Sequence, residues 1–235
     1  MKSALPNLLT LSNLLAGCMA IVFVFDGHLE WASLAVLSGM VFDFFDGLVA
    51  RALKVESAVG KELDSLADMV TFGVVPGLIV YRLLKTSLES QEMSDNMEFM
   101  LPFSAFLITI GAGYRLAKFN VLPSQVHFIG LPTPANALLI VALPLILAYQ
   151  GSDAMNTIIL NHQVLLFLVV LSTTLMNMPI KMMSLKLDSS NWKDMLPQII
   201  LVCMSVVFII TLKFASLPLI ICSHILISII KWYPR

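Results

Sequence analysis

Long apolar stretches, separated by short polar segments, dominate this sequence. A helix that crosses the hydrocarbon core of a membrane needs about 20 predominantly apolar residues. Eight stretches approach that length, so the pattern predicts an all-α fold, a polytopic bundle of transmembrane helices. Proline and glycine lie near several of the ends, as expected where helices stop. The predicted spans are residues 6–25, 30–51, 63–84, 99–120, 132–149, 162–180, 195–213 and 216–232.

The composition agrees with a membrane protein. Only 12% of the 235 residues are charged and 58% are hydrophobic, whereas a soluble globular domain carries about 25% charged residues. The net charge of −1 gives no reason to expect a nucleic-acid partner. No long linker or repeat divides the chain, so residues 1–235 are expected to form a single integral membrane domain. The first apolar stretch is expected to remain as a spanning helix and not to be removed as a signal peptide.

The positions of lysine and arginine predict the orientation. Cytoplasmic loops of membrane proteins hold most of these residues. If eight helices cross the membrane and both termini are cytoplasmic, all of the 14 lysine and arginine residues except Arg82, Lys85 and Lys213 lie on the cytoplasmic side. We therefore expect cytoplasmic termini and, for a compact chain of this kind, location in the inner membrane of a prokaryote.

Four aspartates lie in or beside the second and third predicted spans. Asp43 and Asp46 are three residues apart, so they share one face of a helix. Asp64 and Asp68 are four apart and share a face of the next helix. Each aspartate at the centre of a spanning helix costs about 2.5–3.5 kcal/mol. Because a short loop joins the two helices, the four carboxylates are expected to converge near the cytoplasmic interface.

Four carboxylates in one place repel one another and need positive partners. One or two divalent cations would remove the repulsion, and carboxylate and water ligands suit Mg²⁺ or Mn²⁺. Pairing with Arg51, Lys54 and Lys61 is an alternative, but it leaves four acids against three bases. A divalent-cation transporter is a second alternative, although it needs acids spread along a path through the bilayer. Clustering at one end favours an active site at the cytoplasmic face.

Small residues and one arginine accompany the aspartates. Gly47, Ala50 and Gly60 allow a phosphate or a second helix to approach the backbone closely. Arg51 offers a guanidinium that can bind a phosphate through two hydrogen bonds. Ordinary helix packing and an interfacial arginine are the alternative interpretations. These four residues are therefore candidates for contacts with a phosphate-bearing ligand.

The complete pattern, D-x2-D-G-x2-A-R-x8-G-x3-D-x3-D, occupies residues 43–68. It resembles the signature of the CDP-alcohol phosphotransferase family at every fixed position. The resemblance implies a membrane enzyme that moves a phosphatidyl or similar group from a CDP-linked donor to an alcohol and releases CMP. It also implies a homodimer and a six-helix core, here about residues 6–180, with two further helices at 195–232.

The resemblance further implies roles for individual residues. The four aspartates would hold two divalent metal ions, Mg²⁺ or Mn²⁺, and Asp68 would also act as the general base. Asn7, Thr10 and Asn13 recur at helical spacing on the first span. We prefer the interpretation that they line a cytidine pocket over the alternative that they form hydrogen bonds between helices. The residues expected to bind the CDP moiety are Asn7, Thr10, Asn13, Gly47, Ala50, Arg51, Ser57 and Gly60.

Four stretches resemble the membrane-spanning branch of the family that uses CDP-diacylglycerol as donor and L-serine as acceptor. A serine site needs a cation for the carboxylate; Arg115 and Lys118 could supply it and Asn120 could assist, although a topology anchor is the alternative. Glycerol 3-phosphate or inositol (phosphate) is the alternative acceptor, but a site for an anionic phosphate is expected to need a larger cluster of basic residues near the aspartates. The stretches are residues 6–13, 64–76, 115–120 and 128–137.

Overall fold

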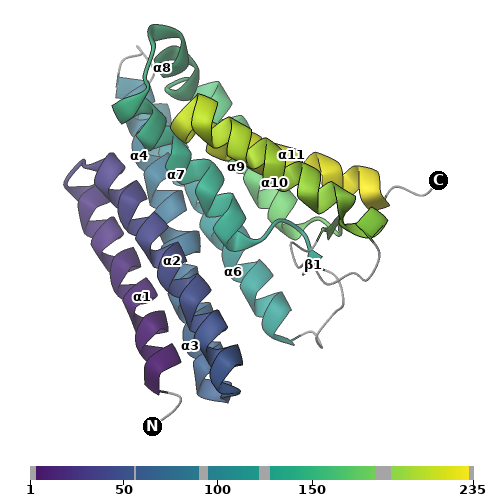
Figure 1. Ribbon diagram of the computed structural model, residues 1–235. Coiled ribbons are helices and arrows are strands. Elements are labelled where there is room, and N and C mark those ends of the chain that lie inside the picture. Colours follow the sequence, from purple (N-terminus) through teal and green to yellow (C-terminus); the bar gives the residue numbers. More distant parts are fainter. Residues whose placement is uncertain (1–3, 56, 90–94, 122–127, 184–191, 233–235) are drawn as a thin grey trace.

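The computed structural model describes residues 4–55, 57–89, 95–121, 128–183 and 192–232. Nearly all of these residues are helical, which confirms the predicted all-α fold (Figure 1). Each of the eight predicted spans coincides with a helix or with consecutive helices. In chain order the elements are α1 (Ala4–Phe25), α2 (Leu29–Leu53), α3 (Ala58–Asp68), η1 (Met69–Val74), α4 (Val75–Glu89), α5 (Asp95–Met100), η2 (Leu101–Ala105), α6 (Phe106–Val121), β1 (Phe128–Ile129), α7 (Thr133–Tyr149), α8 (Asp153–Ile159), α9 (His162–Asn177), β2 (Lys181–Met182), α10 (Trp192–Leu212), η3 (Lys213–Ala215) and α11 (Ser216–Trp232).

Length and apolarity mark this as an integral membrane protein. Five helical runs in the described residues are long and apolar enough to cross a membrane, or six if α8 and α9, bent by 57°, count as one span. Helix α7 has 17 residues and is a shorter apolar helix. Large apolar side chains point outward where lipid would contact them; the side chain of Phe25, for example, is 74% exposed. The eight-span topology with cytoplasmic termini stays a prediction.

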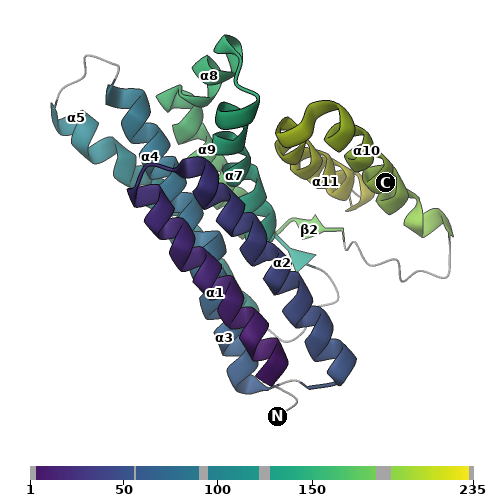
Figure 2. The ribbon, with the colours of Figure 1, turned by 60° about the vertical axis from the view of Figure 1, so that its left-hand side comes forward.

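The first two helices pack closely because small residues lie between them. Ala20 on α1 and Ala32 on α2 are completely buried, and Gly39 on α2 is buried with its open side toward Asn13 and Ala16 of α1. Small side chains let membrane helices approach each other closely. Helices α1 and α2 lie side by side in both views, and α1 also packs on α3 and η1 (Figures 1 and 2). The start of α1, the end of α2 and the start of α3 meet at one end of the bundle (Figures 1 and 2).

A π-helical turn interrupts the third span. The span runs without a break from Ala58 to Glu89, and its residues Met69–Val74 form η1. Turns of this type occur as single insertions in α-helices, frequently at functional sites. The turn directly follows Asp68 and buries Thr71, Phe72 and Gly73 against neighbouring helices. The hydroxyl of Thr109 on α6 donates to the carbonyl oxygen of Gly73 at 3.0 Å, which links this turn to α6.

The last two helices form a hairpin that crosses the bundle obliquely (Figure 1). Lys213 adopts a φ of 47° in the tight turn η3, and α10 and α11 pack on each other. Ile221 of α11 is buried in the core, and the backbone N–H of Met183 donates to Ser228 Oγ at 3.1 Å. A two-residue antiparallel ladder, β1 with β2, lies beside this hairpin and was not predicted from the sequence.

Candidate active site

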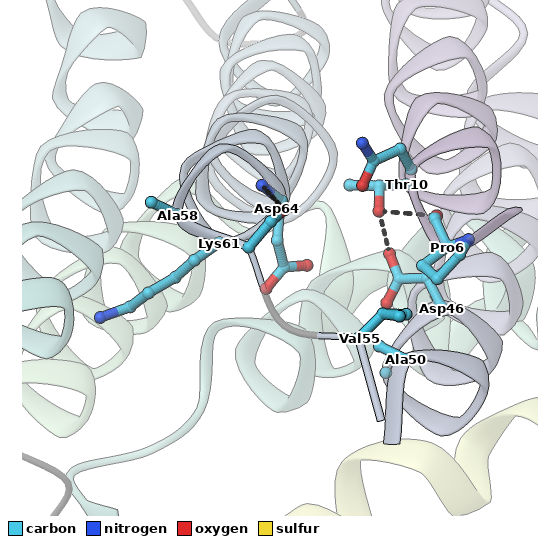
Figure 3. A pocket seen from close by; sticks show the side chains of 12 residues that line it. Pro6, Thr10, Asp46, Ala50, Val55, Ala58, Lys61 and Asp64 are labelled. Carbon is cyan, nitrogen blue, oxygen red and sulfur yellow. Dashed lines mark hydrogen bonds between the residues drawn. The ribbon is translucent and has the colours of Figure 1, made fainter. Parts of the chain in front are cut away.

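A cavity of about 530 Å³ opens where the start of α1, the end of α2 and the start of α3 meet (Figure 3). Its walls carry both apolar and acidic side chains. Six of the eight residues predicted to bind CDP line it; Asn13 and Arg51 do not. The lining residues are Pro6, Asn7, Thr10, Asp46, Gly47, Ala50, Val55, Ser57, Ala58, Gly60, Lys61 and Asp64.

The connection between α2 and α3 gives the cavity its rim. Lys54 ends α2 in the left-handed conformation, with a φ of 54°, and the N–H of Val55 donates to the carbonyl of Ala50 at 3.1 Å. Such left-handed residues satisfy the free carbonyls at a helix end. Ser57 then caps α3, because its hydroxyl oxygen accepts from the N–H of Gly60 at 3.0 Å. The Ser57 hydroxyl thus lines the cavity but is already used as a helix cap.

Arg51 lies at the edge of this cavity. It is exposed on the last turn of α2, and its Nη2 atom lies 4.0 Å from the point where a Cβ atom on Gly47 would be. Apart from the backbone of α2 itself, no other atom of the described residues lies within 4 Å of that point, so the cavity wall beside Gly47 is open. A guanidinium on the rim and open space over a glycine are compatible with a phosphate at this position.

Three of the four predicted carboxylates converge. Asp43, Asp64 and Asp68 are half-buried, and one carboxylate oxygen from each lies within 4.8 Å of the others. Asp46 is oriented differently: it is 6% exposed and accepts a hydrogen bond of 2.6 Å from Thr10 Oγ1 (Figure 3). Asp46 and Asp64 both line the cavity, so the acidic cluster continues into the cavity wall.

Within the described part of the chain, no lysine or arginine forms an ion pair with these aspartates. Arg51 and Lys54 are exposed, and the Lys61 ammonium donates to the carbonyl of Asn120 at 3.1 Å, pointing away from Asp64 (Figure 3). The predicted alternative, pairing with these bases, is therefore not what the structure has. Half-buried carboxylates with no ion pair to a described lysine or arginine form an all-oxygen donor set that fits a hard divalent metal ion.

Asn13 holds Asp68 and lies outside the cavity lining. It is completely buried, and its Nδ2 donates to Asp68 Oδ1 at 3.3 Å. The backbone carbonyl oxygen of Asn13 accepts a hydrogen bond from Thr71 Oγ1 at 3.0 Å. The sequence predicted a contact with cytidine for Asn13 and offered no role for Thr71. The structure instead connects α1, η1 and Asp68 through these two residues.

Substitution of Gly39 should disturb this arrangement. A Cβ atom on Gly39 would lie 2.8 Å from both Asn13 Oδ1 and Thr71 Cγ2. We expect Gly39→Ala to lower the free energy of unfolding in detergent by about 1–3 kcal/mol, the usual cost of overpacking. Gly113→Ala is the matched control, because its Cβ would meet only the flexible Met69 side chain at 3.4–3.5 Å. Both variants gain the same helix propensity, so equal stability would contradict the predicted clash.

The three residues predicted to bind the acceptor are placed differently from one another. Arg115 is half-buried on α6, two residues beyond Gly113, which faces the side chain of Met69 next to Asp68. Its buried Nε has no hydrogen-bond partner among the described residues. Lys118 is exposed and forms no hydrogen bond or ion pair within the described chain. Asn120 Nδ2 donates to Ser65 Oγ at 2.8 Å, a contact that the sequence did not indicate.

Comparison with known proteins gives a family and several relatives. The profile of the CDP-alcohol phosphatidyltransferase family matches residues 3–175. The CDP-diacylglycerol--serine O-phosphatidyltransferase of Bacillus subtilis (strain 168) is 36% identical over 140 residues, 59% of this chain and 74% of the relative. The protein of the same name from Helicobacter pylori (strain 26695) is 31% identical over 230 residues, 97% of this chain and 90% of the relative. A third, from Methanocaldococcus jannaschii, is 36% identical over 137 residues, 58% of each chain.

Proposed function

Because this chain belongs to the CDP-alcohol phosphatidyltransferase family, we propose that it transfers the phosphatidyl group of CDP-diacylglycerol to the hydroxyl of L-serine, forming phosphatidylserine and CMP. The similarity to serine O-phosphatidyltransferases, which extends over 97% of the chain for the Helicobacter relative, carries this proposal. The acidic cluster beside a cavity at one end of the helices supports it, because phosphoryl transfer depends on charge stabilisation.

The donor occupies the cavity in this proposal. The cytidine diphosphate moiety lies among Asn7, Thr10, Gly47, Ala50, Ser57 and Gly60, with Arg51 at the rim binding phosphate, and the two acyl chains stay in the membrane. Asn13 serves the same site indirectly, through its hydrogen bond to Asp68. Asp43, Asp46, Asp64 and Asp68 would hold divalent cations, Mg²⁺ or Mn²⁺ and two per site, which would neutralise charge on the pyrophosphate and on departing CMP.

Asp68 acts as the general base. The serine hydroxyl gives its proton to the Asp68 carboxylate while its oxygen forms a bond to the phosphatidyl phosphorus. The bond from that phosphorus to the oxygen of CMP breaks, and CMP leaves with the electron pair. The base must lie within hydrogen-bond reach of the hydroxyl. Asn13 supports this role because its amide fixes one oxygen of Asp68 and leaves the other for the acceptor or a metal ion.

The cluster lies at the end of the helices that also carries Arg51, Lys54 and Lys61. Because lysine and arginine collect on the cytoplasmic side, this supports an active site at the cytoplasmic face, with both termini cytoplasmic and the protein in a prokaryotic inner membrane. The donor then arrives within the bilayer and serine from the cytoplasm. The homodimer implied by the family resemblance also stays a prediction, to be tested by the mass of the purified protein in detergent.

The test of this function is acceptor-dependent release of CMP. Purified full-length protein in detergent–lipid micelles receives CDP-diacylglycerol, Mg²⁺ or Mn²⁺, and one acceptor: L-serine, glycerol 3-phosphate, myo-inositol or inositol phosphate. Release with serine alone supports the proposal. Release only with another acceptor would leave the family chemistry and overturn serine as the substrate. Folded, metal-binding protein that releases no CMP with any acceptor would favour a cation transporter instead.

Arg115 is the proposed cation for the serine carboxylate, and Lys118 remains a second candidate from the same helix. A hydrogen bond to a charged group contributes about 1.5–3 kcal/mol. Arg115→Ala should therefore raise the KM for serine about 10- to 100-fold and leave the KM for CDP-diacylglycerol within about twofold. Arg82→Ala, on α4 beside Gly27, is the matched control. An unchanged KM for serine in the Arg115 variant would remove this residue from the acceptor site.

A further inference from the structure

Polar contacts connect the end of α6 to α3. They involve residues to which the proposed reaction mechanism assigns no role. Asn120 Nδ2 donates to Ser65 Oγ at 2.8 Å, and the Ser65 hydroxyl lies 3.2 Å from Asn120 Oδ1. The Lys61 ammonium donates to the backbone carbonyl oxygen of Asn120 at 3.1 Å. Both side-chain polar groups of Asn120 and its carbonyl are therefore engaged by one face of α3.

These contacts suit the end of a helix. Asn120 precedes the last residue of α6, so its carbonyl is one of the four that have no partner within the helix. A lysine ammonium at this position satisfies the carbonyl and interacts favourably with the helix dipole. Ser65 follows Asp64 directly and precedes Asp68 by three residues. The contacts therefore fix the end of α6 against the part of α3 that carries two of the clustered carboxylates.

Arg115 lies on the same helix, five residues before Asn120. Its buried Nε has no partner within the described chain, and Gly113, two residues earlier on α6, faces the side chain of Met69, the residue that follows Asp68. Helix α6 also packs against η1, the turn that follows Asp68, so a second contact holds α6 beside the third span. Rotation or sliding of the end of α6 would change the separation of the Arg115 guanidinium from Asp68. The contacts of Asn120 lie where they prevent that movement.

We propose that Ser65, Asn120 and Lys61 form a latch that positions Arg115 relative to Asp68, and so determines the affinity for an acceptor that carries both a hydroxyl and a carboxylate. This inference rests on the proposed function. In such an acceptor only a few bonds separate the two groups, which limits their distance, so the base and the cation must be held at a matching separation. A misplacement of about 1 Å in a catalytic site costs up to about a hundredfold in rate. Ser65 and Asn120 are thus positioning residues.

Ser65→Ala, Asn120→Ala and the double variant test the latch by steady-state CMP release. A hydrogen bond contributes about 0.5–1.5 kcal/mol, so each single variant should raise the KM for serine about three- to tenfold. The KM for CDP-diacylglycerol should stay within about twofold, because no lining residue is changed. The double variant should be no worse than the poorer single variant, since both remove the same contact.

Two further variants complete the design. Ser65→Thr retains the hydroxyl and should restore the KM for serine to within about twofold of the unaltered chain. Ser12→Ala on α1 removes a hydroxyl that bonds to Leu8 of its own helix, at 2.9 Å, and should change neither KM. An unchanged KM for serine, additive losses in the double variant, equal increases of both KM values, or loss of monodisperse folded protein would each overturn the latch. Absence of serine-dependent release from the unaltered chain would instead count against the proposed function.

Discussion

Asp68→Asn should lower serine-dependent CMP release by about 10³-fold, while the protein still folds and still accumulates in the membrane. A positioned general base contributes about 10²–10⁴-fold to a reaction rate. Asparagine has nearly the shape of aspartate but cannot accept the proton of the acceptor hydroxyl. It also removes one carboxylate from a group of three whose oxygens lie within 4.8 Å of one another. Both losses act on the same step, so the effect should be among the largest for any single substitution.

The matched control is Asp153→Asn, at the exposed start of α8. The side-chain change is the same, and this variant should release CMP at the rate of the unaltered protein. The rates are compared at saturating donor, serine and metal, so that weaker binding does not imitate slower chemistry. Less than a tenfold loss in the Asp68 variant would show that another group accepts the proton.

Removal of divalent cations should abolish CMP release completely and reversibly. Asp43, Asp64 and Asp68 have no lysine or arginine ion pair in the described chain, so chelation leaves their charges repelling one another. Added Mg²⁺ or Mn²⁺ should restore activity. A ligand that binds only the folded state also stabilises it, by about 2.7 kcal/mol at a concentration 100 times its Kd. The unfolding temperature should therefore rise with metal concentration, independently of any substrate.

Asp43→Asn and Asp64→Asn separate this site from a general effect of salt. Each removes one carboxylate from the cluster, and we expect the metal concentration for half-maximal stabilisation to rise at least tenfold. Asp153→Asn should keep the metal response of the unaltered protein. Full activity in the presence of excess chelator, or an equal thermal response in all variants, would exclude the cluster as the metal site.

The sequence predicted those parts of the structure that depend on local periodicity. Apolar stretches placed the helices, and the four-residue spacing of Asp64 and Asp68 put both on the side of α3 that faces Asp43. The orientation of Asp46 was not predictable in this way. It depends on the hydroxyl of Thr10, which reaches Asp46 only because α1 packs closely on α2. Spacing within one helix carries no information about such a partner.

Contacts between distant helices account for the other differences. Asn13 was expected to contact cytidine, but the close packing allowed by Gly39 buries it and directs its amide to Asp68. Asn120 was expected to contact serine, and its amide is engaged by Ser65. Contacts of both residues with cytidine or serine stay predictions. Which polar group each one meets is decided by the relative rotation of the helices, which a hydrophobic pattern does not record.

In the third span, the number of residues in the π-helical turn η1 determines how the helix before the turn is rotated relative to the helix after it. An α-helix turns by about 100° per residue, and η1 joins the half that carries Asp64 and Asp68 to α4, the second half of the span (Val75–Glu89). Deletion or insertion of one residue between Met69 and Val74 would turn the carboxylates by more than a quarter of a revolution relative to α4. The number of residues in η1, Met69–Val74, therefore determines the direction in which the acidic cluster faces relative to α4.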